Sequence, residues 1–329
     1  TSPLQRGFEQ SYALLQGGAS HFDSTGIITF DAHKAPAVTY RENGKVVELP
    51  KSGVYSSEMF ADRIIGNIDA GRGDGKPFFA YLAFTAPHWP LHAPDAFINK
   101  YEGRYDAGYD AIRDARVARM KRLGLIANDS GVYTGNPVWP KWNQLTPEQQ
   151  KIDAKRMAVY AAMVDARDHQ IGRVVEHLKR IGEYDNTFIF FMSDNGADGN
   201  SVLDEGQTRA WAHRYTDNSI QNTGRPGSFA DYGPGWAQAA SPFNMYKAFM
   251  YEGGISVPAF AVLPNGMSGG GALKSQSVHT MDVAPTLLEL AGTRHPGTHY
   301  QGREVWPIKG QSMLAGLSGR APSVLPKDH

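Results

Sequence analysis

The amino-acid sequence predicts an α/β fold with a mostly parallel sheet and helices on both of its faces. First, a continuous apolar run at residues 78–84 suits a strand that is covered on both faces, and two further apolar runs lie within the predicted strands 187–194 and 257–264. Second, amphipathic helical patterns lie between these runs. Third, alternation of helix and strand favours parallel pairing, because parallel strands need a crossover connection. A length of 329 residues allows one large α/β domain or two smaller ones.

The helices are predicted from their apolar spacing and their ends. Residues 56–71 place apolar side chains four apart and end at a glycine, and residues 109–126 form a second helix. A long helix begins after Thr146, which forms a capping box with Gln149. Residues 284–292 form the last helix. The predicted inner face of the long helix consists of Tyr160, Met163, Val164, Ile171, Val174, Val175, Leu178 and Ile181.

The remaining segments are predicted from their turn residues. Residues 1–50 are turn-rich, and Asn-Gly within "ENGK" is a hairpin signal. Residues 265–271, "NGMSGGG", form a glycine-rich turn after the last predicted strand. Residues 196–242 show no periodicity, and so long an irregular segment in a compact protein is typically functional or mobile.

Composition excludes several classes of protein and site. Lys plus Arg equals Asp plus Glu at 33 each, so no global field favours nucleic acid or a membrane surface. No apolar run approaches the length of a membrane span. Cysteine is absent, which excludes disulfides and thiolate metal sites within the chain and leaves the compartment undetermined.

Polar clusters follow two of the predicted strands. Residues 85–88 follow the first run, and residues 193–196 end the second. If those strands are parallel, both clusters lie at the carboxyl edge of one sheet, where α/β proteins place their sites. Asp194 and Asn195 offer the hard oxygen ligands that Ca²⁺ or Mg²⁺ prefers, although two are too few for a complete site. An ordinary turn is the alternative, since Asp, Asn and Gly are common turn residues.

Three further positions carry candidate chemistry. His88 is either a loop histidine stacked on Trp89 or a site residue, and Pro90 excludes a helical His88–His92 zinc pair. Lys247 is either a surface charge or a cation directed at an anion, because it lies between a long loop and a buried strand. Asp282 precedes the last helix and is predicted to be its N-terminal cap or a charge partner for its dipole.

Several stretches together resemble the formylglycine-dependent arylsulfatases of the alkaline-phosphatase-like superfamily. They are "FFAYLAFTAPHWPLHAP", "MAVYAAMVDARDHQIGRVVEHLKRIGEYDNTFIFFMSDNGA", "YGPGWAQAASPFNMYKAFMYEGGISVPAFAV" and "HTMDVAPTLLELAG". Each stretch is weakly specific by itself, but the ordered set is highly specific. The resemblance extends across nearly the whole chain, from "RGFEQSYALLQGG" to "GQSMLAGLSGR".

The resemblance implies hydrolysis of a sulfate ester, with release of inorganic sulfate. It implies a formylglycine nucleophile that attacks sulfur and one Ca²⁺ that binds the sulfate oxygens. His88 matches the general acid and also a substrate-binding position, Lys247 matches a lysine that holds the sulfate, and Asp194 with Asn195 matches the metal-binding pair. These residue types suit the chemistry, because a leaving oxygen needs a proton donor and a sulfuryl group needs cations around it.

The chain departs from the family pattern at the nucleophile. It contains no Cys and no Ser-x-Pro-x-Arg motif, and family order places that motif upstream of residue 1. Residues 1–329 are therefore expected to form a partial sulfatase catalytic domain. It would lack the nucleophile segment and the C-terminal subdomain, the fold would be incomplete at both ends, and the chain alone would be inactive.

Two alternatives remain from the sequence. One is a phosphatase, phosphodiesterase or phosphonate hydrolase of the same superfamily, and the other is a non-catalytic, truncated sulfatase-like domain.

The expected partner is a small-molecule, aryl or saccharide sulfate ester, with no nucleic acid and no membrane span. A periplasmic or cytoplasmic bacterial-type enzyme is the expected setting, and the sequence does not indicate an oligomeric state.

Overall fold

The computed structural model describes residues 2–50, 52–199, 201, 206–240, 242–264, 267, 271–274 and 277–321. Most of the predicted glycine-rich turn at 265–271 lies outside these residues. The chain divides into two compact units. Unit 1 contains residues 1–177 and 194–257, and unit 2 contains residues 178–193 and 258–329.

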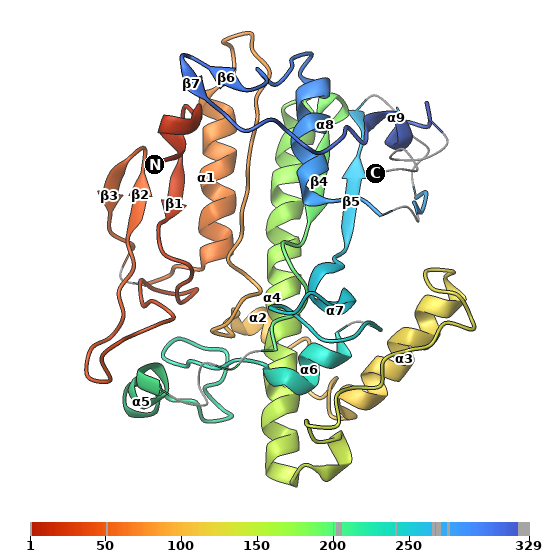
Figure 1. Cartoon of the computed structure of the whole chain (residues 1–329). Coiled ribbons are helices and arrows are strands. Elements are labelled where there is room, and N and C mark those ends of the chain that lie inside the picture. Colours follow the sequence, from red (N-terminus) through yellow and green to blue (C-terminus); the bar gives the residue numbers. More distant parts are fainter. Residues whose placement is uncertain are drawn as a thin grey trace. The chain divides into compact units, whose positions relative to one another are not determined.

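Figure 1 labels the elements in chain order. Those of unit 1 are β1 (Tyr12–Leu14), β2 (Tyr40–Glu42), β3 (Lys45–Val47), α1 (Ser56–Ala70), α2 (Asp95–Ile98), α3 (Gly108–Arg122), α5 (Gly206–Tyr215), α6 (Gly233–Ala239) and α7 (Glu252–Ile255), together with most of α4 (Pro147–Arg180). Those of unit 2 are β4 (Ile189–Met192), β5 (Ala259–Val262), α8 (Val283–Leu290), β6 (His299–Tyr300), β7 (Arg303–Glu304) and α9 (Leu314–Leu317).

The strands do not form the expected parallel sheet. Within the described part of the chain, β1, β2 and β3 form one three-stranded antiparallel sheet, while β4–β5 and β6–β7 are antiparallel pairs. Ile189 of β4 faces Val262 of β5, so the second and third predicted strands are neighbours of opposite direction. Apolar runs indicate burial, and they contain no information on strand direction.

The first apolar run is not a strand. Residues 78–84 have no regular secondary structure, and Phe78, Phe79 and Tyr81 are exposed. A run of this composition is buried only when neighbouring strands pair with it and layers cover both faces. The described residues provide no such ladder for it, so the predicted strand 78–84 is wrong here.

The predictions that depended on local signals are confirmed. The Asn-Gly hairpin joins β2 to β3, and both turn residues take positive φ, 48° at Asn43 and 81° at Gly44. Helix α1 has the predicted start and ends at Gly71, with Phe60 and Ile68 buried. At the start of α4, Gln149 N donates to Thr146 Oγ1 at 3.3 Å, and Thr146 N donates to Gln149 Oε1 at 2.9 Å.

The buried face of α4 differs from the predicted one. Of the predicted inner residues, Met163 and Leu178 are buried, whereas the others are partly exposed. The buried stripe consists instead of Ala154, Ala158, Ala162 and Ala166, four residues apart, with Val159 beside it. Small side chains let neighbouring loops approach the helix closely, and a search for large apolar residues misses such a stripe.

The core of unit 1 joins α4 to three distant segments. Val159, Ala162 and Met163 of α4 pack in one cluster with the loop 86–98, with α6 and with Tyr246. A second cluster consists of Ile27, Trp89, Trp211, Ala212 and Phe229. The segments that carry His88 and Lys247 are thus anchored by their own neighbours, Trp89 and Tyr246.

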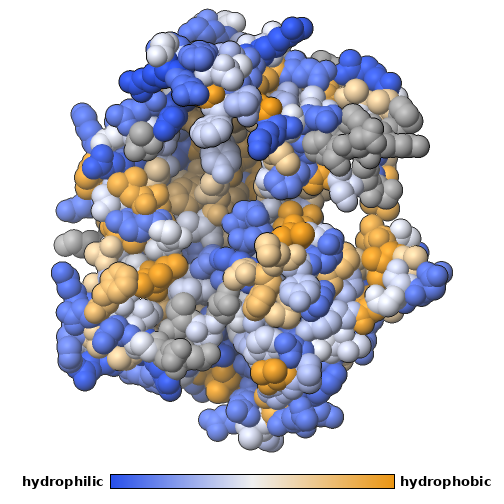
Figure 2. All heavy atoms as spheres, in the orientation of Figure 1, coloured by the Kyte–Doolittle hydropathy of each residue, from blue (hydrophilic) through white to orange (hydrophobic). Residues whose placement is uncertain are grey.

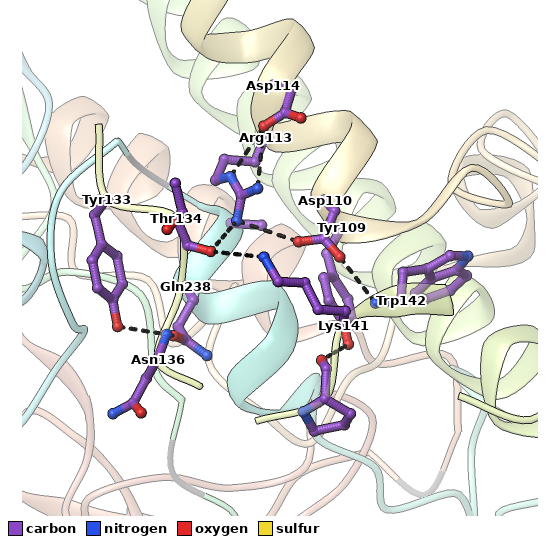
Figure 3. Close-up of polar contacts among 12 residues, drawn as sticks. Tyr109, Asp110, Arg113, Asp114, Tyr133, Thr134, Asn136, Lys141, Trp142 and Gln238 are labelled. Atoms are coloured by element: carbon purple, nitrogen blue, oxygen red, sulfur yellow. Dashed lines mark hydrogen bonds and ion pairs between the residues drawn. The ribbon is translucent and has the colours of Figure 1, made fainter. Parts of the chain in front are cut away.

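Helices α5 and α6 lie within residues 196–242, which the sequence indicated as irregular. Each is short, so the periodic signal is weak. Figure 3 shows the contacts that hold the loop 133–142 against α3 and α6. Arg113 Nη1 donates to Thr134 O at 3.0 Å, and Tyr133 OH donates to Gln238 Oε1 at 3.1 Å. These contacts hold the loop 133–142 against α3 and α6.

In unit 2, Asp282 stands at the predicted N-cap position of α8, but its side chain makes no capping hydrogen bond to that helix. Its Oδ2 accepts from His279 N at 2.7 Å and its Oδ1 accepts from Gln311 N at 2.9 Å. The fully buried carboxylate therefore ties the start of α8 to the segment that leads into α9. Nearby, Met313 packs with Phe190, Val283 and Leu317.

Hydrophilic residues cover most of the face drawn in Figure 2, and hydrophobic ones form separate patches on it. Scattered apolar residues of this kind are normal at protein surfaces. None of the helices within the described ranges has the length and apolar character that a membrane crossing requires.

Candidate active site

The loop that carries His88 is fixed on both sides of the histidine. Ala86 belongs to the first core cluster and Trp89 to the second. Leu91 N donates to Ala230 O at 2.8 Å, which adds a backbone anchor. Prolines 87 and 90 follow cis peptide bonds. The partly exposed imidazole therefore projects from a backbone that is held by buried neighbours.

The segment that carries Lys247 is held by backbone contacts with the loop 194–199. Lys247 N donates to Ala197 O at 2.8 Å, and Gly196 N donates to Gly254 O at 2.9 Å. Met245 and Ala248 take φ values of 63° and 77°, the left-handed region that side chains disfavour. Strained residues of this kind cluster at functional sites.

His88, Lys247 and Asp198 meet through their side chains. Lys247 Nζ lies 3.2 Å from His88 Nε2 and 3.3 Å from Asp198 Oδ2. His88 Nε2 lies 3.4 Å from the same carboxylate oxygen. The structure thus brings together two of the predicted site residues, which are 159 positions apart, and adds a carboxylate.

The contacts of His88 define its tautomer. Nδ1 lies 2.8 Å from Trp89 O, an atom that can only accept, so Nδ1 bears a proton. Nε2 faces both the Lys247 ammonium, which donates, and the Asp198 carboxylate, which accepts. A neutral ring accepts from Lys247 at Nε2, and a protonated ring directs its Nε2–H toward Asp198. Nε2 is therefore the nitrogen that can exchange a proton at this site.

Asp198 is the site residue that sequence reasoning missed. Its side chain is 8% exposed, while those of His88 and Lys247 are 32% and 31% exposed, so the carboxylate lies behind the other two groups. Trp89 Nε1 donates to Asp198 Oδ2 at 3.2 Å, and Asp198 N donates to the hydroxyl of Tyr232 at 2.7 Å. In the sequence, the one feature that could have indicated Asp198 is its position. It follows Asp194 and Asn195 as the next acidic residue of the same glycine-rich turn.

Tyr232 supports this arrangement as a neutral acceptor. Burial raises the pKa of its hydroxyl well above the usual range, and the nearby Tyr160 and Asp198 raise it further. The hydroxyl therefore keeps its proton, and its oxygen accepts the Asp198 N–H without adding a second negative charge beside the carboxylate.

Asp194 and Asn195 begin the loop that ends at Asp198. Asp194 is exposed and Asn195 partly so, and Asn195 Nδ2 donates to Gly196 O at 3.0 Å. Their carboxylate and amide oxygens fit Ca²⁺ by type, whereas a complete site needs six to eight oxygens. In the described ranges no group of three or more His, Cys, Asp or Glu side chains could hold a metal. Asp194 lies in the same loop as Asp198, which contacts His88. That the side chain of Asp194 itself lies close to His88 stays a prediction.

Two buried histidines lie beneath the His88 loop. His21 Nε2 donates to His88 O at 3.0 Å, and His21 Nδ1 accepts from Ser56 Oγ at 2.7 Å. His92 binds backbone groups with both nitrogens, His21 N at 3.3 Å and Ser228 O at 2.9 Å. Burial, with a smaller effect of neighbouring His92, lowers the pKa of His21 to about 3. Burial lowers the pKa of His92 to about 4, so both rings are neutral structural groups.

A family model described as Sulfatase matches residues 5–293. The chain belongs to the sulfatase family, within the alkaline-phosphatase-like superfamily. It is 43% identical over 322 residues to "Uncharacterized sulfatase PB10D8.02c" of Schizosaccharomyces pombe, a match that covers 95% of this chain and 57% of that protein. It is 39% identical over 317 residues to "Arylsulfatase" of Klebsiella aerogenes, covering 95% of this chain and 66% of that sulfatase. This sulfatase chain thus spans between half and two thirds of the length of these relatives.

Solved structures agree at the level of the fold. The crystal structure of Ps i-CgsB in complex with k-i-k-neocarrahexaose matches with a TM-score of 0.55 and 23% identity, over 96% of this sulfatase chain and 51% of that chain. The likeness confirms the fold of the family. This likeness does not confirm the predicted parallel sheet. In the described residues, the strand pairs are antiparallel.

Proposed function

We propose that this sulfatase chain contributes His88, Lys247, Asp194 and Asn195 to the hydrolysis of a sulfate ester that releases inorganic sulfate. The observation that carries the proposal is the 3.2 Å contact between Lys247 Nζ and His88 Nε2. This contact supports the proposal, because a cation suited to a sulfate oxygen lies next to a nitrogen suited to protonate a leaving oxygen. Membership of the sulfatase family supports the reaction class.

The proposed task of His88 follows from the bond that breaks. Hydrolysis separates sulfur from the ester oxygen, which leaves with the electron pair of that bond. An alkoxide or phenoxide is a poor leaving group unless a proton reaches it, and general acids contribute typically ~10²–10⁴-fold in such steps. His88 supplies the proton from Nε2, while Nδ1 stays bonded to Trp89 O and fixes the ring.

Lys247 is proposed to bind the sulfuryl oxygens. Its ammonium is about one third exposed and lies next to His88, so it can reach an anion that enters from solvent. A fixed cation stabilises the charge that spreads over the oxygens during sulfuryl transfer. The backbone hydrogen bond from Lys247 N to Ala197 O holds the segment that carries this charge.

Asp194 and Asn195 are proposed as two oxygen ligands of one Ca²⁺, with the other ligands from elsewhere. When bound, the ion supplies Lewis-acid stabilisation of the sulfate oxygens. The nucleophile is proposed to be a formylglycine outside this chain, which has no cysteine. We propose aryl or saccharide sulfate esters as substrates, and the relative named an arylsulfatase supports the aryl class.

Release of inorganic sulfate from an aryl sulfate by the intact protein tests the proposal, with and without a Ca²⁺ chelator. Turnover should fall on chelation and recover when Ca²⁺ is added back. Asp194→Ala should shift the Ca²⁺ concentration for half-maximal activity upward at least tenfold, because it removes an anionic ligand. Asp217→Ala, at an exposed turn of unit 1, is the matched control. Full activity of Asp194→Ala at limiting Ca²⁺ would contradict the assignment.

A further inference from the structure

We propose that Asp198 is a specificity-determining residue, whose carboxylate beside Lys247 makes the site favour esters with one negative charge over esters with two. The inference rests on the proposed function, in which Lys247 binds the anionic group of the substrate. It concerns a residue that the sequence did not indicate and that the proposed mechanism does not use.

The geometry gives Lys247 an internal counter-ion. Asp198 Oδ2 is 3.3 Å from Lys247 Nζ, and it also accepts from Trp89 Nε1 at 3.2 Å. Because Lys247 and His88 are about one third exposed and Asp198 is 8% exposed, an entering anion meets the cation first. Its oxygens would then lie roughly 6 Å from the carboxylate, the sum of the measured contact and an ordinary N–H···O distance.

Asp198 cannot easily turn away from an anion. Its backbone N–H is bonded to the buried Tyr232 hydroxyl, and the Trp89 indole that holds its oxygen is itself in the second core cluster. A surface carboxylate would move aside and be screened by water. This one is fixed and largely desolvated, so its repulsion acts on every bound anion.

The charge count defines which anions are disfavoured. Lys247 and Asp198 sum to zero, so this pair offers an entering anion no excess positive charge, and a proton on His88 adds one positive charge equally for every anion compared. A sulfate monoester has one negative charge, and a phosphate monoester has two above its second pKa of about 6. Repulsion from one fixed charge doubles in free energy for the dianion. If removal of the Asp198 charge raises the affinity for a monoanion by some factor, it should therefore raise the affinity for a dianion by the square of that factor.

Anion binding tests this without any turnover. Calorimetric titration at pH 8 compares perrhenate, a tetrahedral monoanion, with sulfate, a tetrahedral dianion, on wild type and Asp198→Asn. We expect Asp198→Asn to bind perrhenate about threefold tighter and sulfate about ninefold tighter, since the second factor is the square of the first. Equal changes for both anions, or weaker binding of both, would overturn the inference.

Two variants separate charge from structure. Asp198→Glu keeps the charge and should keep the wild-type ratio of the two affinities, even if each affinity changes. Asp231→Asn removes another buried carboxylate, which accepts from Ser201 Oγ at 2.7 Å, and should leave the ratio unchanged. A ratio that shifts in Asp231→Asn as much as in Asp198→Asn would show a general effect of lost charge and contradict a specific role.

Turnover in the intact protein provides the second readout. With 4-nitrophenyl sulfate and 4-nitrophenyl phosphate at pH 8, the phosphate-to-sulfate ratio of kcat/KM should rise about threefold in Asp198→Asn. An unchanged ratio in an active protein would sink the inference and leave the proposed function intact. No sulfate release from wild type, combined with the expected anion pattern, would instead sink the proposed function and support Asp198 as a charge filter.

Discussion

At the His88 imidazole the two ring nitrogens have different surroundings, and we propose a structural task for Nδ1 and a chemical task for Nε2. Nδ1–H holds the ring to the Trp89 carbonyl, whereas Nε2 faces Lys247 and Asp198. Replacement of the ring removes both tasks, so a rate loss alone does not identify a proton donor. The dependence of that loss on the leaving group does.

We expect His88→Ala to slow esters of poor leaving groups far more than activated aryl sulfates. An alkyl sulfate should lose about 10²–10³-fold in kcat, and 4-nitrophenyl sulfate about tenfold or less, because nitrophenoxide needs less protonation. The measurement is kcat across a series of sulfate esters with different leaving-group pKa values. His299→Ala, at an exposed histidine of β6, is the control. Equal losses across the series would count against His88 as the acid.

Asp198 marks the limit of prediction at the level of single residues. Short motifs surround His88 and Lys247 and indicate them as candidates, and the structure brings Lys247 Nζ within 3.2 Å of His88 Nε2. Asp198 lies in an ordinary glycine-rich turn, and its proposed role depends on contacts with Trp89 and Lys247, 109 and 49 positions away. No local pattern encodes such contacts.

Among the elements, the loop 194–199 and the segment 244–254 meet through backbone that leaves no room for side chains. A Cβ on Gly196 would collide with the carbonyl oxygen of Gly253, and one on Gly253 with that of Met245. The hydrogen bonds of Gly196 N to Gly254 O and of Lys247 N to Ala197 O depend on this close approach. The Glu-Gly-Gly sequence before β5 is thereby explained by packing that positions Lys247.

Gly196→Ala should lower the free energy of unfolding by about 1–3 kcal/mol, the usual cost of inserting a methyl group into packed structure. Gly66→Ala, in the middle of α1 with no atom within 4 Å of the added carbon, should raise it by about 0.5–1 kcal/mol through helix propensity. Urea unfolding of the two variants and wild type measures both signs. A neutral Gly196→Ala would show that the two segments can separate without cost.

Prediction from sequence succeeded for elements that are defined locally. The hairpin at Asn43 and Gly44, helix α1 and the capping box at Thr146 each depend on residues within a few positions. It failed for the pairing of β4 with β5, which are 67 positions apart at their paired ends, Met192 and Ala259. Strand direction is decided by tertiary contacts, and an apolar run is compatible with either direction.

For the whole molecule, the buried His21 and His92 make folding sensitive to acid. Burial lowers their pKa values to about 3 and about 4, whereas an unfolded histidine titrates near ~6.5. Between these limits the unfolded chain binds two protons that the folded chain does not bind. Stability is therefore fully present above pH ~6.5 and is lost as the pH falls, at about 2 kcal/mol per histidine by pH 5.

The unfolding free energy should accordingly fall from pH 7 to pH 5, and His92→Gln should flatten that slope by about half. Glutamine cannot titrate, and its amide N–H can replace the bond from His92 Nε2 to Ser228 O. The measurement is urea unfolding followed by tryptophan fluorescence at several pH values, with His299→Gln as the control. The same slope in His92→Gln as in wild type would mean that other groups dominate the acid response.

The exposed run at residues 78–84 is a segment along which strands from other copies of this protein could pair. Seven residues without charge, proline or glycine, outside any described ladder, have the composition of cross-β spines. Pro77 and Pro87 flank the run, and proline lacks the N–H that a ladder needs, so the two act as gatekeepers. We therefore expect any intermolecular strand that pairs with this run to end before it reaches His88.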